Sequence, residues 1–133
     1  MNNNYINDLT LEATNFFTNI GITKKLHGTN YLMDVLVLVL DKNHEIDSDL
    51  YREIAKIHHD KPQNIERCIR YAKDKSLERM SYDDQIALYG HVVNYESGNI
   101  YNFDFINIVV DKIKYNINKK NWLSVLYFYF AMT

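Results

Sequence analysis

Apolar side chains recur at helical spacing in several segments of the chain, with short polar segments between them. This pattern predicts helices separated by loops. The first helix is expected to begin at a cap provided by Asp8 or Thr10 and to end at Gly21. The residues expected on its inward face are Leu11, Phe16 and Phe17.

A second helix is expected over residues 31–40, with Thr29 or Asn30 as its cap. The apolar run at residues 35–40 could also be a buried strand. A helix is preferred because the chain shows no second convincing strand with which this run could pair.

Residues 50–76 have the pattern of a helix-turn-helix, in which two short helices pack at a steep angle. Leu50, Ile54 and Ala55 give the first of these helices an inward stripe, and the small Ala55 allows a close crossing. His59 falls at the turn, where a left-handed backbone conformation is usually required.

The start of the second helix also carries local signals. Asp60 can cap it, and Gln63, three residues later, completes a capping box. Pro62 fits the first turn, where its missing N–H leaves no hydrogen bond unmade. A helix over residues 62–75 is therefore expected.

This helix divides into two faces. The apolar stripe consists of Ile65, Cys68, Ile69 and Ala72. The polar face consists of Gln63, Glu66, Arg67, Arg70 and Asp74. Arg can pair with guanine, Glu can accept from cytosine, and Gln can pair with adenine. An ordinary amphipathic helix with a solvated charged face would show the same division, so the pattern alone leaves both interpretations open.

Two more helices are expected, one starting at Asp83 or Asp84 and stopping at Gly90, the other starting at Asn102 or Asp104. The predicted fold class is all-α, a compact bundle of about six helices with an aromatic C-terminal extension. We expect a flexible N-terminus over residues 1–9, a DNA-binding domain over 10–114 and a hydrophobic extension over 115–133. The aromatic segment 122–132 could pack back on the bundle or form a dimer contact.

The net charge of −2 argues mildly against a nucleic-acid partner, but the charges are unevenly distributed. Residues 51–79 hold eight Lys or Arg against five acids, and residues 112–120 hold four Lys and no acid. A local basic face is sufficient to displace counterions from phosphates. An ordinary mixed surface remains the alternative.

The chemistry of the chain favours no enzyme class. The single Cys68 excludes an internal disulfide, and no apolar run reaches the roughly 20 residues that span a bilayer. His58 and His59 diverge by about 100° on a helix and seldom share one ion. No Gly-rich phosphate loop or nucleophile motif is present. We expect a cytoplasmic protein with no metal, cofactor, membrane or small-molecule substrate.

Two segments carry a recognisable pattern, Tyr51-x-Glu53-Ile54-Ala55-Lys56 and Ile65-Glu66-Arg67-Cys68-Ile69-Arg70-Tyr71-Ala72. They resemble Tyr-Pro-Asp-Ile-Ala-Lys and Val-Glu-Arg-Ala-Ile-Arg-His-Ala of one family. This is the C-terminal effector domain of the sporulation response regulator, stage zero sporulation protein A. The likeness covers roughly residues 10–114.

The resemblance implies an all-helical domain that binds short DNA boxes, often as a tandem head-to-tail pair. It implies that Glu66, Arg67 and Arg70 lie on the base-reading helix and that Lys112 lies near the DNA backbone. The family's receiver domain is not present in this sequence, so control by phosphorylation is not carried over. A basic residue of the family is replaced by Asn64, and an aromatic one by His58.

These observations together predict a sequence-specific transcription regulator that reads a short box of double-stranded DNA in the major groove with the helix 62–75. It would act alone, as a homodimer or as a tandem pair. The expected base-reading residues are Gln63, Glu66, Arg67 and Arg70. The expected phosphate contacts are Lys56, Lys61, Asn64, Lys73 and Lys112. The alternative is an interaction module that has lost DNA binding and dimerises or antagonises a related regulator.

Overall fold

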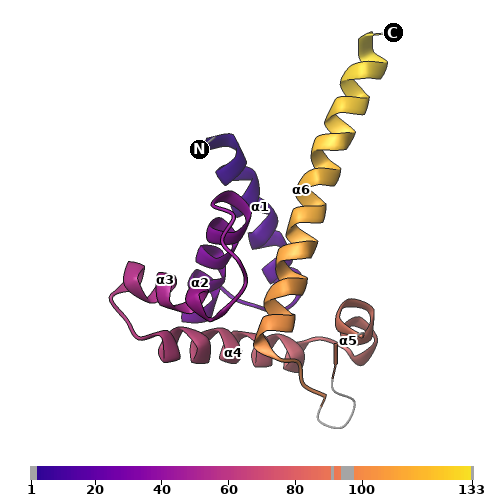
Figure 1. The fold of residues 1–133 in the computed structure, drawn as a ribbon. Helices are drawn as coiled ribbons and strands as arrows, with labels where there is room; N and C mark the ends of the chain where they lie inside the picture. Colours follow the sequence, from indigo (N-terminus) through magenta and orange to yellow (C-terminus); the bar gives the residue numbers. More distant parts are fainter. Residues whose placement is uncertain (1–2, 91, 94–97, 133) are drawn as a thin grey trace.

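The apolar stripes of the sequence become the inner faces of packed helices in a computed structural model, which describes residues 3–90, 92–93 and 98–132 (Figure 1). The described elements are α1 (Asn3–Asn19), α2 (His27–Leu36), the π-helical turn η1 (Val37–Asp41), α3 (Ser48–His58), α4 (Pro62–Arg79), α5 (Tyr82–Tyr89) and α6 (Asn102–Met132). The predicted all-α class is confirmed, and the segment 35–40 is helical rather than a strand.

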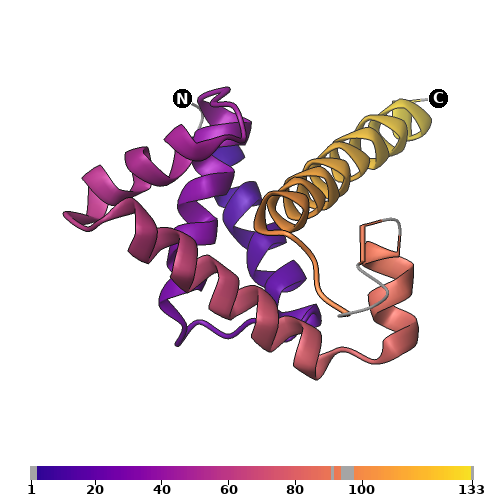
Figure 2. The ribbon, with the colours of Figure 1, turned by 60° about the horizontal axis from the view of Figure 1, so that its bottom comes forward.

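The core lies where α2 meets α4 and where α1 meets the first half of α6. Figure 2 shows α4 crossing the front of the molecule, with α3 beside its first turns. The fully buried side chains include Leu32, Leu36, Ile54, Ile69 and Phe105, which come from the four helices α2, α3, α4 and α6. One continuous core therefore holds the helix-turn-helix against the remaining helices.

Gly28 sets the distance between α2 and α4. A Cβ atom at this position would lie 2.2 Å from the carbonyl oxygen of Cys68 and 2.9 Å from the Cβ of Ala72. Both neighbours belong to α4, and the nearer one is backbone, which cannot rotate away. Glycine is therefore required for the helices to approach this closely.

The C-terminal end of α4 is tied to the loop that follows α1. The Ser76 hydroxyl donates to the Ile20 carbonyl at 2.5 Å, and the Arg79 guanidinium donates to the Gly21 carbonyl at 2.6 Å. Gly21 has a φ of 80°, which favours glycine. These bonds fix α4 at the end opposite the helix-turn-helix.

The first helix begins earlier than predicted. It starts at Asn3 rather than at Asp8 or Thr10, so it includes most of the segment expected to be flexible. Its buried positions are Leu9, Ala13 and Phe17, spaced by four residues. Leu11 was expected to face inward, but half of its surface is exposed because it lies two residues from the stripe.

The predicted cap of the second helix was also wrong. Helix α2 begins at His27, with Leu26 at the cap position and no side-chain cap. Thr29 lies inside the first turn, where its hydroxyl donates to the Thr23 carbonyl at 2.5 Å. The helix then ends in the wider turn η1 before the loop to α3.

The C-terminal extension is not a separate element. Helix α6 begins at Asn102, which is therefore its first residue and not its cap as predicted, and it continues for 31 residues to Met132. Its inner face is buried as far as Ile117, whereas residues 118–132 are exposed and do not pack back on the bundle. Of the helices in the described ranges, none is long and apolar enough to cross a membrane.

We expect Gly28→Ala to lower the free energy of unfolding by about 3 kcal/mol, because the added methyl group forces α2 away from α4. Gly98→Ala is the control: its φ is 68°, but nothing lies within 4 Å of a Cβ there. Only the backbone strain of about 1 kcal/mol should appear. Urea unfolding of both variants makes the comparison. Equal losses would contradict the tight crossing.

Candidate nucleic-acid interface

The turn between α3 and α4 has the conformation that the sequence predicts. His59 adopts the left-handed conformation with φ 53° and ψ 45°. The backbone N–H of Asp60 then donates to the Ala55 carbonyl at 2.9 Å, which closes the end of α3. The chain reverses within three residues, and Pro62 begins α4.

Helix α4 buries one face and exposes the other. Ile65, Ile69 and Ala72 have no exposed surface, and Cys68 is half-buried. Burial raises the pKa of the Cys68 thiol, so it stays protonated at neutral pH. The opposite side presents Arg67 and Arg70 to solvent. A helix held in this way, with one polar face free, is the part of a helix-turn-helix that enters the major groove.

Six predicted contact residues gather in one place. A shallow hollow of about 390 Å³ on the free face of α4 is lined by Lys61, Gln63, Asn64, Glu66, Arg67 and Arg70. This set includes all four residues expected to read bases. Lys56 and Lys112 are exposed on α3 and α6 but do not line the hollow. Lys56 instead pairs with Glu53 at 3.1 Å.

A chain of hydrogen bonds orients one side of the hollow. The Asp60 carboxylate accepts the backbone N–H of Lys61 at 2.7 Å and the side-chain amide of Asn64 at 2.5 Å. The Asn64 carbonyl oxygen in turn accepts from the Arg67 guanidinium. The hydroxyl of Tyr31 on α2 also donates to Asp60, at 3.4 Å. The position of Arg67 is thus coupled to the turn.

Asp60 fills a different place from the predicted one. The residue at the cap of α4 is Lys61, and no side chain caps it. The predicted capping box of Asp60 and Gln63 was therefore wrong. The carboxylate instead serves the Lys61 N–H and Asn64, and these hydrogen bonds hold the pKa of Asp60 below its usual value.

Glu66 and Arg70 form the other side of the hollow. The Arg70 Nη1 atom lies 2.9 and 3.0 Å from the two carboxylate oxygens of Glu66. Asn102, the first residue of α6, donates from its side-chain amide to the Glu66 carboxylate at 3.0 Å and to its backbone carbonyl at 3.2 Å. Glu66 is therefore held from two directions before any partner binds.

Lys73 was expected to contact a phosphate, and the structure places it elsewhere. Only 2% of its surface is exposed, and its ammonium donates to the Ile100 carbonyl at 2.5 Å. Burial lowers its pKa, an effect that the nearby Asp74 opposes. A group enclosed in this way cannot reach a phosphate on the surface, so Lys73 is a structural residue.

Two flanking hollows contain basic residues that the sequence reasoning missed. On the α3 side, a hollow of about 340 Å³ is lined by Ser48, Tyr51, Arg52, Pro62, Gln63 and Glu66. On the α2 side, a hollow of about 260 Å³ is lined by Lys25, Leu26, His27, Gly28, Arg67, Cys68 and Tyr71. Arg52 could have been found from its place on the polar face of α3, the first helix of the helix-turn-helix. Nothing in the local sequence pattern marked Lys25 as part of this surface.

His58 is held at the edge of this region rather than within the core. Its Nε2 atom lies 2.5 Å from an oxygen of Asp34, and its ring meets the Tyr31 ring edge-on at 4.9 Å. Asp34 and Tyr31 both belong to α2, so these contacts join α2 to α3. Among the described residues, no three His, Cys, Asp or Glu side chains gather where they could hold a metal ion.

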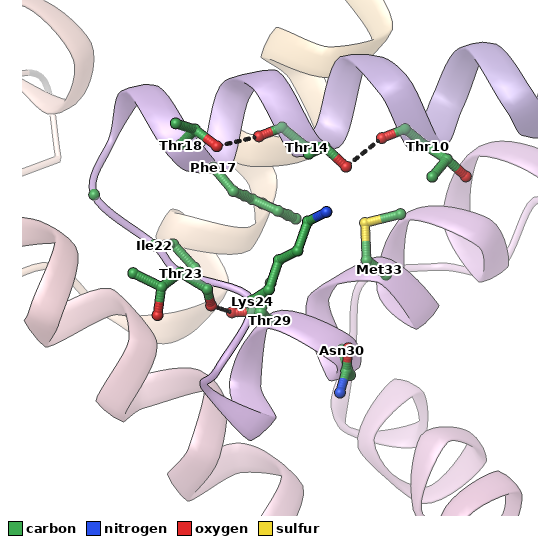
Figure 3. Close-up of a pocket in the computed structure, with 11 residues that line it drawn as sticks. Thr10, Thr14, Phe17, Thr18, Ile22, Thr23, Lys24, Thr29, Asn30 and Met33 are labelled. Carbon is green, nitrogen blue, oxygen red and sulfur yellow. Dashed lines mark hydrogen bonds between the residues drawn. The ribbon is translucent and has the colours of Figure 1, made fainter.

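A larger cleft of about 530 Å³ lies between α1 and α2, away from α4's free face (Figure 3). Thr10, Thr14 and Thr18 form one wall, and all three hydroxyls already donate to carbonyls one turn earlier; dashed lines in the figure mark the bonds of Thr14 and Thr18. The Lys24 side chain extends across the cleft from the other side. No carboxylate, His or Cys is among the described residues that line it, and its polar side chains are threonines, Asn30 and Lys24.

A tightly held turn, a helix with one buried face and a free face of Arg, Glu and Gln define a helix-turn-helix domain of the DNA-binding class. The family model for the sporulation initiation factor Spo0A C-terminal domain matches residues 13–113, and the chain belongs to this family. The family consists of DNA-binding regulator domains and is not an enzyme family. The match ends within α6, so residues 114–132 lie beyond it.

Alanine variants of Lys73 and Lys112 should distinguish a structural lysine from one that is expected to contact a DNA phosphate. Lys73→Ala should lower the free energy of unfolding by about 2 kcal/mol, because it removes a buried chain and leaves the Ile100 carbonyl without its donor. Lys112→Ala should leave stability within about 0.5 kcal/mol and reduce the salt slope of DNA binding by about one. Chemical unfolding and salt titrations measure both. A stable Lys73→Ala protein with a reduced salt slope would reverse the assignment.

The free energy of unfolding at acidic pH should depend on the ionisation of Asp60. Because its folded pKa is lowered, its carboxylate contributes stability above the unfolded value of 3.8, and the contribution is lost as pH falls through the folded value. Asp60→Asn should therefore be less stable than the native protein at neutral pH. The difference should shrink towards about pH 3, as unfolding experiments across this range can measure. Asp111→Asn, on the exposed side of α6, is the matched control and should show no such trend.

Proposed function

We propose that this chain is a sequence-specific DNA-binding transcription regulator that reads a short box in the major groove with α4. The observation that carries the proposal is the gathering of Gln63, Glu66, Arg67 and Arg70 in one exposed hollow on a helix whose other face is buried. Membership of a DNA-binding family supports it.

Each side chain of the hollow suits a different base edge. Arg67 and Arg70 can each donate two hydrogen bonds to a guanine, Glu66 can accept from a cytosine amine, and Gln63 can pair with adenine. Arg70 is already bonded to Glu66. This pair therefore enters the groove as one unit, in which Glu66 limits the directions that Arg70 can take.

The phosphate contacts are proposed to lie on both sides of this reading surface. Lys61 and Asn64 border it, and Lys56 and Lys112 are exposed on neighbouring helices. We add Arg52 and Lys25, which line the flanking hollows on the α3 and α2 sides. Basic groups on either flank match the two phosphate backbones that border the major groove.

The proposed site of action is the cytoplasm of a bacterial cell, where a regulator of this kind meets the chromosome. Binding by two copies in tandem, as the family resemblance implies, stays part of the proposal.

Selection of bound sequences from a random pool of duplexes tests the proposal directly. We expect a short recurring box that contains guanines. Replacing Arg67 by Ala should then cost roughly 1–3 kcal/mol and relax the preference at one base pair.

Arg67→Lys is the matched variant, because it keeps the charge but cannot form the paired hydrogen bonds of a guanidinium. It should retain the salt dependence of the native protein and lose the preference at the same base pair. A pool that yields no common sequence, or equal affinity for all three proteins, would refute sequence-specific reading by α4.

A further inference from the structure

The end of α6 is an apolar helix whose large side chains are exposed to solvent. We call residues 119–132 the tail helix; they follow the residues that match the family. All of its large apolar side chains are exposed, including Trp122 at 65%, Tyr127 at 79% and Phe130 at 68%. Apolar residues occur on every side of it, a composition found in helices that are buried.

The amount of surface points to a missing protein partner. The chain exposes 8619 Å², whereas a folded monomer of its 15.8 kDa mass is expected to expose about 7,300 Å². The excess is of the size that one partner contributes to a standard protein interface, about 800 Å² or more. The five aromatic side chains of the tail helix alone account for roughly 700 Å² of exposed surface.

We propose that the tail helix pairs with the tail helix of a second copy of this chain in antiparallel orientation. Trp122, Leu126 and Tyr129 recur at i, i+4 and i+7, on the side of α6 opposite the face that it buries in the bundle. With the centre of the overlap between residues 125 and 126, Trp122 of one copy lies opposite Tyr129 of the other. Leu126 is also the least exposed large apolar residue of the tail helix, at 38%.

The distribution of charge favours antiparallel over parallel pairing of the tail helices. Lys114, Lys119 and Lys120 lie at or just before the start of the tail helix, and no acid occurs from residue 112 to residue 132. A parallel pair would bring the lysines of both copies together. An antiparallel pair places Lys119 near the C-terminal end of the other helix, where the backbone carbonyls carry partial negative charge. Lys120 is partly compensated within its own chain by Asp8 at 3.9 Å.

The tail helix is free to pair without disturbing the reading surface. Helix α6 starts beside α4 and leads away from it, so that the C-terminus lies at the far end of the molecule (Figure 1). Pairing can therefore be measured on the whole chain without DNA, and its failure would leave the proposed DNA reading untouched.

Sedimentation equilibrium of the full chain at micromolar concentration tests the pairing. We expect a dimer. Leu126→Glu and Trp122→Glu should each raise the dimer dissociation constant by at least about 30-fold, because they place a charge in the apolar contact. Tyr82→Glu, at a 70% exposed position on α5, is the control and should leave it unchanged. The altered side chains are exposed, so the melting of the monomer fold should not shift.

Spin labels test the orientation. In a Cys68→Ser background, labels at Asn118→Cys should lie about 25 Å apart in an antiparallel pair and about 10 Å apart in a parallel one. The shorter distance would overturn the antiparallel arrangement.

Three other results would overturn the proposal as a whole. The first is a native chain that remains a monomer. The second is a dimer that persists in Leu126→Glu with native affinity. The third is a monomer that binds vesicles of phosphatidylglycerol and phosphatidylcholine through Trp122 and Leu126, which would assign the tail helix to a lipid surface.

Discussion

The close crossing of α2 and α4 is the constraint on which the rest of the structure depends. It is possible only because Gly28 lacks a side chain where the Cys68 carbonyl comes nearest. With the two backbones in contact, Tyr31 on α2 reaches Asp60 in the turn, and Asp34 reaches His58 on α3. Contacts from α2 thereby fix the turn from outside the helix-turn-helix. They also set the direction in which the free face of α4 points, although they do not belong to that face.

The proposed reading surface is ordered by polar contacts and does not carry an excess of positive charge. The net charge of the chain is −2, and Glu66 and Asp60 stand beside Arg67 and Arg70. These carboxylates hold Arg70 directly and Arg67 through Asn64. A surface arranged in this way loses some general attraction for phosphates, and it gains side chains that need little reordering when they meet base edges.

Local signals in the sequence were sufficient for the helix-turn-helix. The stripe of Ile65, Ile69 and Ala72, the left-handed His59 and the early Pro62 act over a few residues, so each could be predicted. Lys73 could also have been placed correctly, because it lies eight residues after Ile65 on the buried side. The bond from Asn102 to Glu66 joins residues 36 positions apart and depends on how α6 meets α4, which no local pattern specifies. The continuity of α6 was missed because Lys119, Lys120 and Asn121 look like a break, although all three are compatible with an exposed helical turn.

The length of α6 determines how far apart the two bundles of a tail-paired dimer would lie. From Asn102 to Leu126 the helix rises about 36 Å, so the starts of the two α6 helices would lie about 70 Å apart in the proposed antiparallel pair, whose tail helices overlap around Leu126. Neighbouring half-sites on one face of a duplex are only about 34–36 Å apart. A pair joined through the tail helices would therefore hold its two proposed DNA-reading surfaces at opposite ends, in a geometry suited to connecting separate stretches of DNA into a loop.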